Sequence, residues 1–290
     1  SRRGHALGMA GMLKSRTQSW TVVGVPRTPD GRTFHVGVTE GECNPRILTV
    51  GDRRRAEVIA KNLENCKQYE SSRGFLVISG TFKGTPVSIV AIGMGTANMD
   101  FLVREARAVC HEPMKIVRFG TCGAFRKDIK VGTVIVAAEG SVMAQQNFNA
   151  FAVEGADCYS FSDPIPADQD LSNTLVRILK EELGEEKVAT GLNCTADSFY
   201  SSQGRFSEHF DDHNRELVGE MIRKMPNLAS CEMESGQLLH LARISRGSVR
   251  ATACCIAVAN RMDDSVIDKE VLEHLEAEAG RAVLAALIHD

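Results

Sequence analysis

The sequence predicts an α/β protein with three layers, α/β/α, in which helices cover both faces of a mixed central β-sheet. Short apolar runs typical of strands alternate along the chain with segments whose apolar residues recur at helical spacing. The 290 residues, 43% of them hydrophobic, are enough for one large core. No internal repeat or change in composition marks a second domain, so we expect one domain over residues 34–290.

In the first half of the chain, apolar runs predict strands and the amphipathic segments between them predict helices. The expected strands are 47–50, 75–79, 87–92, 116–119 and 133–137, and the expected helices are 54–63 and 97–110. Lys83-Gly84-Thr85-Pro86 predicts a turn between the second and third strands. Pro113 is expected to follow the end of the second helix.

In the second half, strands are expected at 189–194 and 251–258, and helices at 171–183, 232–244 and 269–288. Gly184 predicts the end of the first of these helices. The last helix has an apolar stripe formed by Val271, Leu272, Leu275, Ala279, Val283 and Leu287. The polar stretch 201–215 predicts a mobile loop that could cover a site, although an ordinary surface loop has the same composition.

Composition narrows the location and the partners of the protein. A formal net charge of −3 gives no general attraction to nucleic acid or to membranes, and no apolar run reaches the length of a membrane span. Nine scattered cysteines without a Cys-x-x-Cys pair argue for a reducing, cytoplasmic location. Residues 1–33 lack a secretory signal and are expected to form a weakly ordered extension, of which 20–25 could pack back on the fold.

The segment Arg118-Phe119-Gly120-Thr121-Cys122-Gly123-Ala124 is the first sign of a binding site. Its glycines let the backbone approach a ligand closely, and the N–H groups of a turn here would converge on an oxyanion. Arg118 adds a two-pronged, permanently charged donor suited to phosphate oxygens. By itself, the motif also fits an ordinary tight turn with a surface arginine.

Further motifs accompany this one in a fixed order: Phe34-His35-Val36-Gly37-Val38-Thr39, Gly51-Asp52-Arg53-Arg54-Arg55, Ser72-Arg73, Ile92-Gly93-Met94-Gly95, Phe199-Tyr200-Ser201-Ser202-Gln203-Gly204-Arg205 and Cys231-Glu232-Met233-Glu234-Ser235. From about His35 to Arg261, the chain resembles the nucleoside phosphorylase family whose members use a single α/β domain, and within it the uridine branch. The resemblance implies reversible phosphorolysis of uridine to uracil and ribose 1-phosphate.

Three arginines predict a phosphate site. Arg55 follows a Gly-Asp turn at the start of a helix, Arg73 precedes a strand, and Arg118 precedes the Gly-Thr pair. A buried dianion requires several fixed cations, although each arginine alone would more often be a solvated surface charge. The resemblance implies that the backbone at Gly51 and the hydroxyl of Thr121 bind phosphate as well.

Glu232-Met233-Glu234 predicts a sugar site, because a carboxylate can accept two hydrogen bonds from a cis-diol. Acidic residues are also common in the first turn of a helix, so the motif alone leaves both interpretations open. The resemblance places Glu234 on the ribose hydroxyls, Met233 against the sugar ring and Thr121 next to it.

The resemblance also implies a composite site and an oligomer. In the family, the ribose-contacting histidine, here His35, and the phosphate arginine that matches Arg73 come from a neighbouring subunit. We therefore expect a homodimer or an assembly of dimers. Some bacterial uridine phosphorylases bind a monovalent cation between subunits through a Glu at the position of Gly74, so an interface ion stays an open question.

Gln203 and Arg205 predict recognition of a uracil edge. The glutamine amide can accept from a ring N–H and donate to one carbonyl, while the arginine donates to the other. A spacing of two in an extended segment would place both side chains on one side. Phe199 could stack on the base, a contact of about 1–3 kcal/mol in nucleic-acid sites. The resemblance adds three residues to this pocket: Cys122, Gly123 and Val258.

The Gln-x-Arg pair favours the uridine branch over the purine branch, which carries an Asp acid in a Ser-Asp pair after the late strand. Here that strand ends in Val258-Ala259-Asn260-Arg261, although Asp263 and Asp264 follow closely. The expected catalytic residues are Arg118, Gln203 and Arg205.

Phosphate is the expected co-substrate, and neither a cofactor nor a metal site is predicted. His209 and His213 are four residues apart, but their setting is typical of a solvated loop. The alternatives are a purine nucleoside phosphorylase, a nucleosidase that uses water on the same fold, and a nucleoside-binding paralogue without activity.

Overall fold

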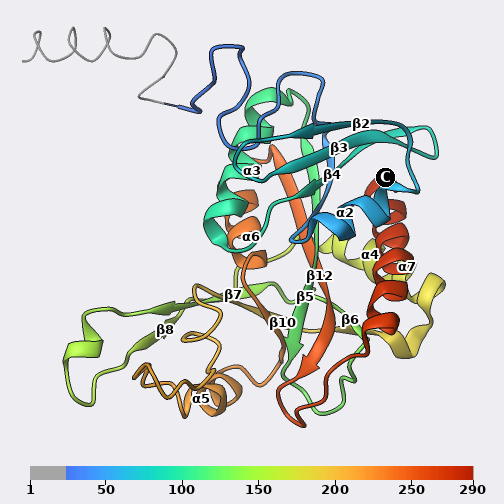
Figure 1. Ribbon diagram of the computed structural model, residues 1–290. Helices are drawn as coiled ribbons and strands as arrows, with labels where there is room; N and C mark the ends of the chain where they lie inside the picture. The colour runs from blue at the N-terminus through green and yellow to red at the C-terminus, as the bar shows by residue number, and fades with distance from the viewer. Residues whose placement is uncertain (1–23, 290) are drawn as a thin grey trace, which may run out of the picture.

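The computed structural model of the protein describes residues 24–289, and its strands join in one sheet (Figure 1). The strands are β1 (Arg46–Val50), β2 (Glu64–Glu70), β3 (Leu76–Phe82), β4 (Thr85–Ala91), β5 (Met114–Ala124), β6 (Val134–Val136), β7 (Ser141–Gln146), β8 (Tyr159–Phe161), β9 (Val188–Thr190), β10 (Leu192–Ala196), β11 (Leu228–Glu232) and β12 (Val249–Asn260). The helices are α2 (Arg53–Ala60), α3 (Thr96–Val109), α4 (Gln169–Leu183), α5 (Leu217–Lys224), α6 (Ser235–Ile244) and α7 (Lys269–Ile288), with short 3-10 helices η1 (Ala150–Ala152) and η2 (Glu185–Lys187).

The sheet is mixed, as predicted. Its main path runs β2-β3-β4-β1-β5-β11-β10-β7-β8, and β12 joins β5 to β6, which pairs with β9. The strand β1 is parallel to both β4 and β5, and β5 is parallel to β12 along its whole length. In contrast, β11 is antiparallel to β5, and β2, β3 and β4 form an antiparallel meander.

Helices cover both faces of this sheet, which confirms the three-layer prediction (Figure 1). On one face, α3 and α6 pack in a core with Ile47 and Ile116, whereas α2, α4 and α7 pack on the other with Leu48 and Val117. Neighbouring residues of β1 and β5 thus face opposite cores. Central strands covered on both faces are apolar throughout, so their sequences are easily recognised.

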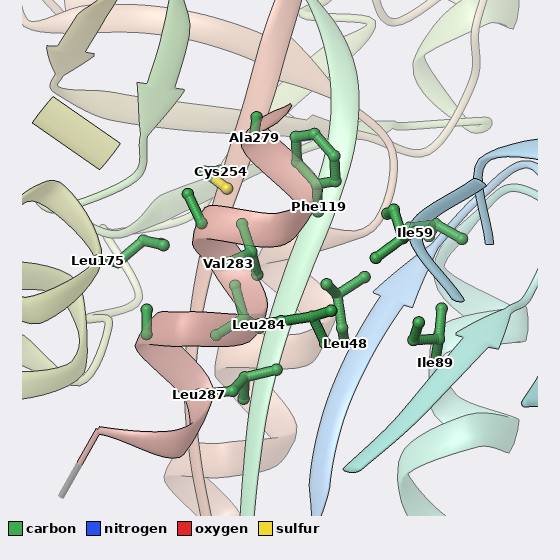
Figure 2. Packing of buried hydrophobic residues seen from close by; sticks show 14 of the residues in the cluster. Leu48, Ile59, Ile89, Phe119, Leu175, Cys254, Ala279, Val283, Leu284 and Leu287 are labelled. Atoms are coloured by element: carbon green, nitrogen blue, oxygen red, sulfur yellow. The ribbon is translucent and has the colours of Figure 1, made fainter. Parts of the chain in front are cut away.

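The core under α7 fixes the two central strands. Figure 2 shows Val283, Leu284 and Leu287 of α7 packed with Leu48 of β1 and Phe119 of β5, and all five are fully buried. Burial of each such side chain contributes about 1.5–3 kcal/mol. This packing therefore holds in place the strands whose ends carry the predicted phosphate residues.

Most predicted elements are present near their expected bounds. The helix α7 has the predicted ends, and α4 ends just before Gly184, whose φ of 98° suits glycine. Asp168 precedes α4 and accepts a hydrogen bond from the N–H of Leu171, an N-cap that the sequence analysis did not assign.

The segment Gly120–Ala124 is not the turn that the sequence suggested. It continues β5, because the long strand β12 pairs with it as far as Asn260, with a register shift near Ala257. Several other bounds also differ. The predicted helix 54–63 ends at Ala60, where the side-chain amide of Asn62 donates to the carbonyl of Ile59.

Two further boundaries differ for local reasons. The predicted helix 232–244 begins at Ser235, because Glu232 ends β11 and its carboxylate accepts from the N–H groups of Glu234 and Ser235. The predicted strand 189–194 is two strands on either side of Gly191, since β9 pairs with β6 while β10 pairs with β7 and β11.

Five elements were not predicted from the sequence: β2, β7, β8, β11 and α5. The strand β2, of sequence ENCKQYE, is polar and mostly exposed because it lies at the sheet edge and pairs only with β3. The strand β8 has only three residues, too few for a clear period, and it forms with β7 the projecting hairpin in Figure 1. The eight-residue α5 is amphipathic but follows closely after the polar stretch 201–215.

Residues 24–33 of the predicted N-terminal extension belong to the described part, whereas residues 1–23, including Trp20, lie outside it. Thr33 is fully buried and bridges to Arg27, whose guanidinium donates to the carbonyl of Ala108 on α3. Within residues 24–289, none of the helices combines the length and the apolar character needed to cross a membrane.

Candidate active site

Most of the predicted site residues line one cavity of about 370 Å³. It lies beyond the ends of β1, β4, β10 and β11 and along the end of β5, a common place for ligands in α/β sheets. The predicted residues that line it are Gly51, Arg55, Arg118, Thr121, Cys122, Gly123, Phe199, Gln203, Arg205, Met233, Glu234 and Val258.

Three of the predicted phosphate residues, Gly51, Arg55 and Arg118, meet at the start of α2. The side chain of Asp52 caps this helix by accepting from the N–H of Arg55 at 2.8 Å. A side chain at Gly51 would be crowded, because a Cβ would lie 3.1 Å from the carbonyl oxygen of Gly93 and 3.3 Å from a guanidinium nitrogen of Arg118. The absence of a Cβ thus lets the guanidinium of Arg118 lie close to the backbone of Gly51, just before α2 and Arg55.

Arg118 and Glu234 form a buried ion pair across the cavity. The guanidinium Nη2 lies 2.8 Å from Glu234 Oε2, and both side chains are at most 5% exposed. Burial opposes the charge of Arg118, but the attraction of Glu234 outweighs it, so the pKa of the guanidinium is raised. Glu234 Oε1 accepts from the N–H of Gly95 at 2.6 Å. The predicted phosphate and ribose residues are therefore in direct contact.

Glu232 is hydrogen-bonded to the backbone of Glu234, one partner of this ion pair. Its carboxylate accepts from Asn193, from Thr195 and from the backbone of Glu234 and Ser235. Complete burial, together with the nearby charge of Glu234, raises the pKa of Glu232. Glu232 belongs to the motif that predicts a sugar site, but its sequence position alone indicates no role for it.

Gln203 and Arg205 lie together at the cavity, as predicted, but the segment is a turn and not an extended strand. Gly204 has a φ of 64°, and the guanidinium of Arg205 donates directly to Gln203 Oε1 at 2.5 Å. Burial and the neighbouring Arg261 lower the pKa of Arg205. Arg205 also lies over the ring of Phe199, 3.8 Å from its centroid, so one face of the proposed stacking ring is already covered.

The turn is anchored at several points. Arg261 donates to the carbonyls of Gln203 and Gly204, and the side-chain amide of Asn214 donates to those of Ser201 and Arg205. These bonds fix the first part of the 201–215 stretch, and the predicted motion of this loop stays a prediction.

Two predicted site residues, His35 and Arg73, do not line the cavity. They lie near each other because both contact Phe34. The ring of His35 is edge-on to the ring of Phe34, and the guanidinium of Arg73 lies 5.1 Å from the centroid of the Phe34 ring. Arg73 is exposed, while His35 stacks on Phe101 and has Nδ1 2.6 Å from the buried carboxylate of Glu105.

Cys122, which follows Thr121 in the sequence, lines the cavity. A hydrogen bond with Cys255 and complete burial raise the pKa of the Cys122 thiol well above its ordinary value, so it is a neutral group at physiological pH.

The cavity also includes residues that the sequence analysis did not assign: Asp52, Gly93, Met94, Cys231, Glu232 and Ala259. Gly93 could have been found, since it follows a predicted strand within a quoted motif, and its φ of 74° requires a flexible residue. Ala259 carries no such signal.

The described residues contain no group of three or more His, Cys, Asp or Glu side chains placed to hold a metal ion. His213 lies 3.6 Å from Asp211, and its side chain is about half exposed.

The family model of the phosphorylase superfamily matches residues 45–288. The chain belongs to this superfamily. A uridine phosphorylase of Thermococcus kodakarensis is 27% identical over 239 residues, which cover 82% of this chain and 80% of that protein. A DeoD-type purine nucleoside phosphorylase of Oceanobacillus iheyensis is 34% identical over 214 residues, or 72% of this chain and 80% of that protein.

Solved structures are similar as well. One, from a structural and catalytic analysis of two diverse uridine phosphorylases in the oomycete Phytophthora capsici, has a TM-score of 0.91 and 42% identity, and the match covers 94% of this chain and 99% of that one. A Trypanosoma brucei nucleoside phosphorylase has a TM-score of 0.76 at 20% identity, which supports the fold alone.

Proposed function

We propose that the protein catalyses the reversible phosphorolysis of uridine to uracil and ribose 1-phosphate, the reaction of a pentosyltransferase. The observation that carries this proposal is the shared cavity, in which the Gln203–Arg205 pair faces the same space as Arg55, Arg118 and Glu234. The 42% identity to a structure from a study of uridine phosphorylases supports it.

In this proposal, phosphate is the nucleophile and binds to Gly51, Arg55, Arg118 and Thr121. Fixed cations near Glu234 would place it against the sugar, which lowers the entropic part of the barrier. The negative charge of phosphate also stabilises the oxocarbenium-like sugar of the transition state. Because phosphate attacks directly, the chemistry requires neither a covalent enzyme intermediate nor a cofactor.

Arg205 and Gln203 would stabilise the negative charge that grows on the departing uracil. The contact between their side chains at 2.5 Å holds the donor in place before the substrate binds. Preorganised donors of this kind act strongly in sites that exclude water. A uracil anion is a tolerable leaving group, so a strong general acid is not needed.

The purine alternative rests on the relatives named as purine nucleoside phosphorylases. It would require an acid near the base. Asp263 and Asp264 do not line the cavity, and the carboxylate of Asp263 is bonded to Ser265. Both observations favour the uridine reaction.

We also propose a homodimer with composite sites, in which His35 and Arg73 of one subunit complete the cavity of the other. Their position beside Phe34, away from the cavity of their own subunit, supports this arrangement. Light scattering that gives the mass of a monomer, together with full activity of that monomer in the assay, would contradict the proposed dimer.

The free state of all nine cysteines supports the proposed cytoplasmic location, where thiols stay reduced. Microscopy of the fluorescently tagged chain would test this, and a pool confined to the secretory pathway would contradict it.

Uracil release from uridine, measured by absorbance with and without phosphate, tests the activity. Release that requires phosphate and yields ribose 1-phosphate is the expected result. Equal release without phosphate would make the protein a nucleosidase, and cleavage of inosine in place of uridine would indicate a purine enzyme.

A further inference from the structure

A buried carboxylate outside the cavity holds the phosphate residue Arg55. Glu276 of α7 has a side chain only 2% exposed, and its Oε1 accepts from Arg55 Nε at 2.8 Å. Its second oxygen accepts from Arg54 Nη2 at 2.6 Å. Glu276 lies more than 200 residues from Arg55 in the sequence and does not line the cavity.

The packing of α2 on α7 makes this contact possible. One turn after Arg55, Ile59 of α2 faces Gly280 of α7, which lies one turn after Glu276. A Cβ on Gly280 would come 2.4 Å from Ile59 Cγ1, so only glycine allows this approach. The ion pair and the close contact thus lie on the same two helix faces. Figure 1 shows α2 beside α7.

The contact with Glu276 leaves the Nη groups of the Arg55 guanidinium for a ligand. Glu276 occupies the Nε edge, and Nη1 has only a long contact of 3.5 Å with the carbonyl of Phe119. The side chain of Arg55 is 7% exposed and lines the cavity. A planar guanidinium held by one edge can present its remaining N–H groups in a fixed direction.

We infer that Glu276 is a positioning residue for phosphate, which aims the Arg55 guanidinium into the cavity without touching the substrate. This inference rests on the proposed phosphorolysis. It predicts a selective effect, because the carboxylate acts on the phosphate residue and on no group assigned to ribose or uracil. If the Glu276–Arg55 contact only stabilised the fold, its loss would change the KM values for phosphate and uridine alike.

The test is Glu276→Gln, with Glu273→Gln as its matched control. Glu273 lies on the same helix and also reaches Arg54, at 3.5 Å, but it is 43% exposed and makes no contact with Arg55. In Glu276→Gln, we expect the KM for phosphate to rise at least about tenfold while the KM for uridine stays within about twofold. Glu273→Gln should leave both constants unchanged.

A second readout does not depend on turnover. Phosphate should raise the Tm of the wild-type protein, and this shift should be much smaller in Glu276→Gln at equal phosphate concentration. If Glu276→Gln does not fold, Glu276→Asp keeps the charge, withdraws the carboxylate by one methylene, and should show the same selective loss for phosphate.

Equal changes in the two KM values, or an unchanged KM for phosphate, would overturn the inference while leaving phosphorolysis intact. Wild-type uracil release that does not depend on phosphate would overturn the proposed function and, with it, this inference. The wild-type assay therefore separates the two outcomes.

Discussion

The charged groups of the cavity are each held by a second polar group before any ligand arrives. Arg118 is paired with Glu234, Arg55 with Glu276, and Arg205 contacts Gln203. Fixed charges need little reorganisation during a reaction, which is the main way in which enzymes stabilise developing charge. The residue pairs, and not the single arginines, are thus the unit on which the proposed activity depends.

Arg205→Ala or Gln203→Ala should lower kcat/KM for uridine more than tenfold, about 1.4 kcal/mol or more, since each removes a donor or acceptor for uracil. Steady-state kinetics will measure this loss. Arg215→Ala is the matched control, because Arg215 lies 3.9 Å over Phe206 as Arg205 lies over Phe199, but does not line the cavity. Equal losses in both arginine variants would mean that loop packing, and not base recognition, is responsible.

At the scale of the elements, the long central strands position the site. The pairing of β5 with β12 carries Thr121 and Cys122 to the cavity, and the helices α2 and α6 begin beside it. Local caps fix these helix starts, through Asp52 for α2 and Glu232 for α6. Side-chain caps also begin helices distant from the site, where the contribution of a cap to stability can be tested without affecting catalysis.

Asp168 provides such a test, since it caps α4 and forms an ion pair with Arg250 at 2.7 Å. The hydrogen bond from Arg250 lowers the pKa of Asp168. A lowered folded pKa stabilises the fold above the ordinary carboxyl value of about 3.9, and this contribution is lost as the pH falls through the folded value.

Asp168→Ala should lower the free energy of unfolding at pH 7 by about 1 kcal/mol for the cap, plus less than about 1 kcal/mol for the half-exposed pair. Asp168→Asn keeps a capping side chain and should lose only the second part, a deficit that shrinks as the pH falls below the ordinary carboxyl value of about 3.9 and through the lowered folded pKa. Urea unfolding at pH 7 and at a series of lower pH values will check this. A deficit of Asp168→Asn that is independent of pH would contradict the ionic contribution.

Gly280→Ala should be destabilising, because the new methyl group would collide with Ile59 and force α7 away from α2. We expect a loss of about 1–3 kcal/mol, typical of an overpacked core. Gly219→Ala is the control, since that Cβ would meet only Arg223 at 3.6 Å in α5 and should stabilise by up to about 1 kcal/mol. Chemical unfolding of both variants decides the point, and a stabilised Gly280→Ala would refute the tight contact.

At the scale of the whole molecule, burial of charge is concentrated around the site. Within the described residues, the buried charged side chains are Arg55, Glu105, Arg118, Glu232, Glu234 and Glu276. Each either lines the cavity or holds a predicted site residue. Buried charges are unfavourable unless paired, so the gathering of five of the six in the cavity or on Arg55 is itself a functional signal. Glu105 lies with His35 outside the cavity.

Hybrid dimers will test whether sites are shared between subunits. Arg55→Ala and Arg73→Ala should each be nearly inactive alone, but a hybrid of the two would contain one site with both arginines. Random mixing should restore about a quarter of the wild-type activity, because half of the dimers are hybrids with one intact site of two.

The control for this experiment mixes His35→Ala with Arg73→Ala. Each hybrid site would then lack one donated residue, so no recovery is expected. Recovery in the control, or none in the first mixture, would show that His35 and Arg73 do not act across an interface.

The sequence by itself determined the fold class, the helices α3, α4 and α7, and most of the residues that line the cavity. These features depend on local patterns, namely apolar period, glycine at helix ends and charged residues beside glycine-rich strand ends. The polar edge strand β2 was not predicted because its sequence lacks such a pattern, whereas α5 is amphipathic but has only eight residues.

Only the tertiary structure decided that Gly120–Ala124 continues a strand, that Gln203 and Arg205 meet in a turn, and that His35 and Arg73 lie outside their own cavity. It alone revealed the contacts of Glu232 and Glu276. The physical reason is that each of these facts depends on a partner distant in sequence. The pairing of β12, the bonds from Arg261 and the approach of α7 to α2 arise only when the chain is folded.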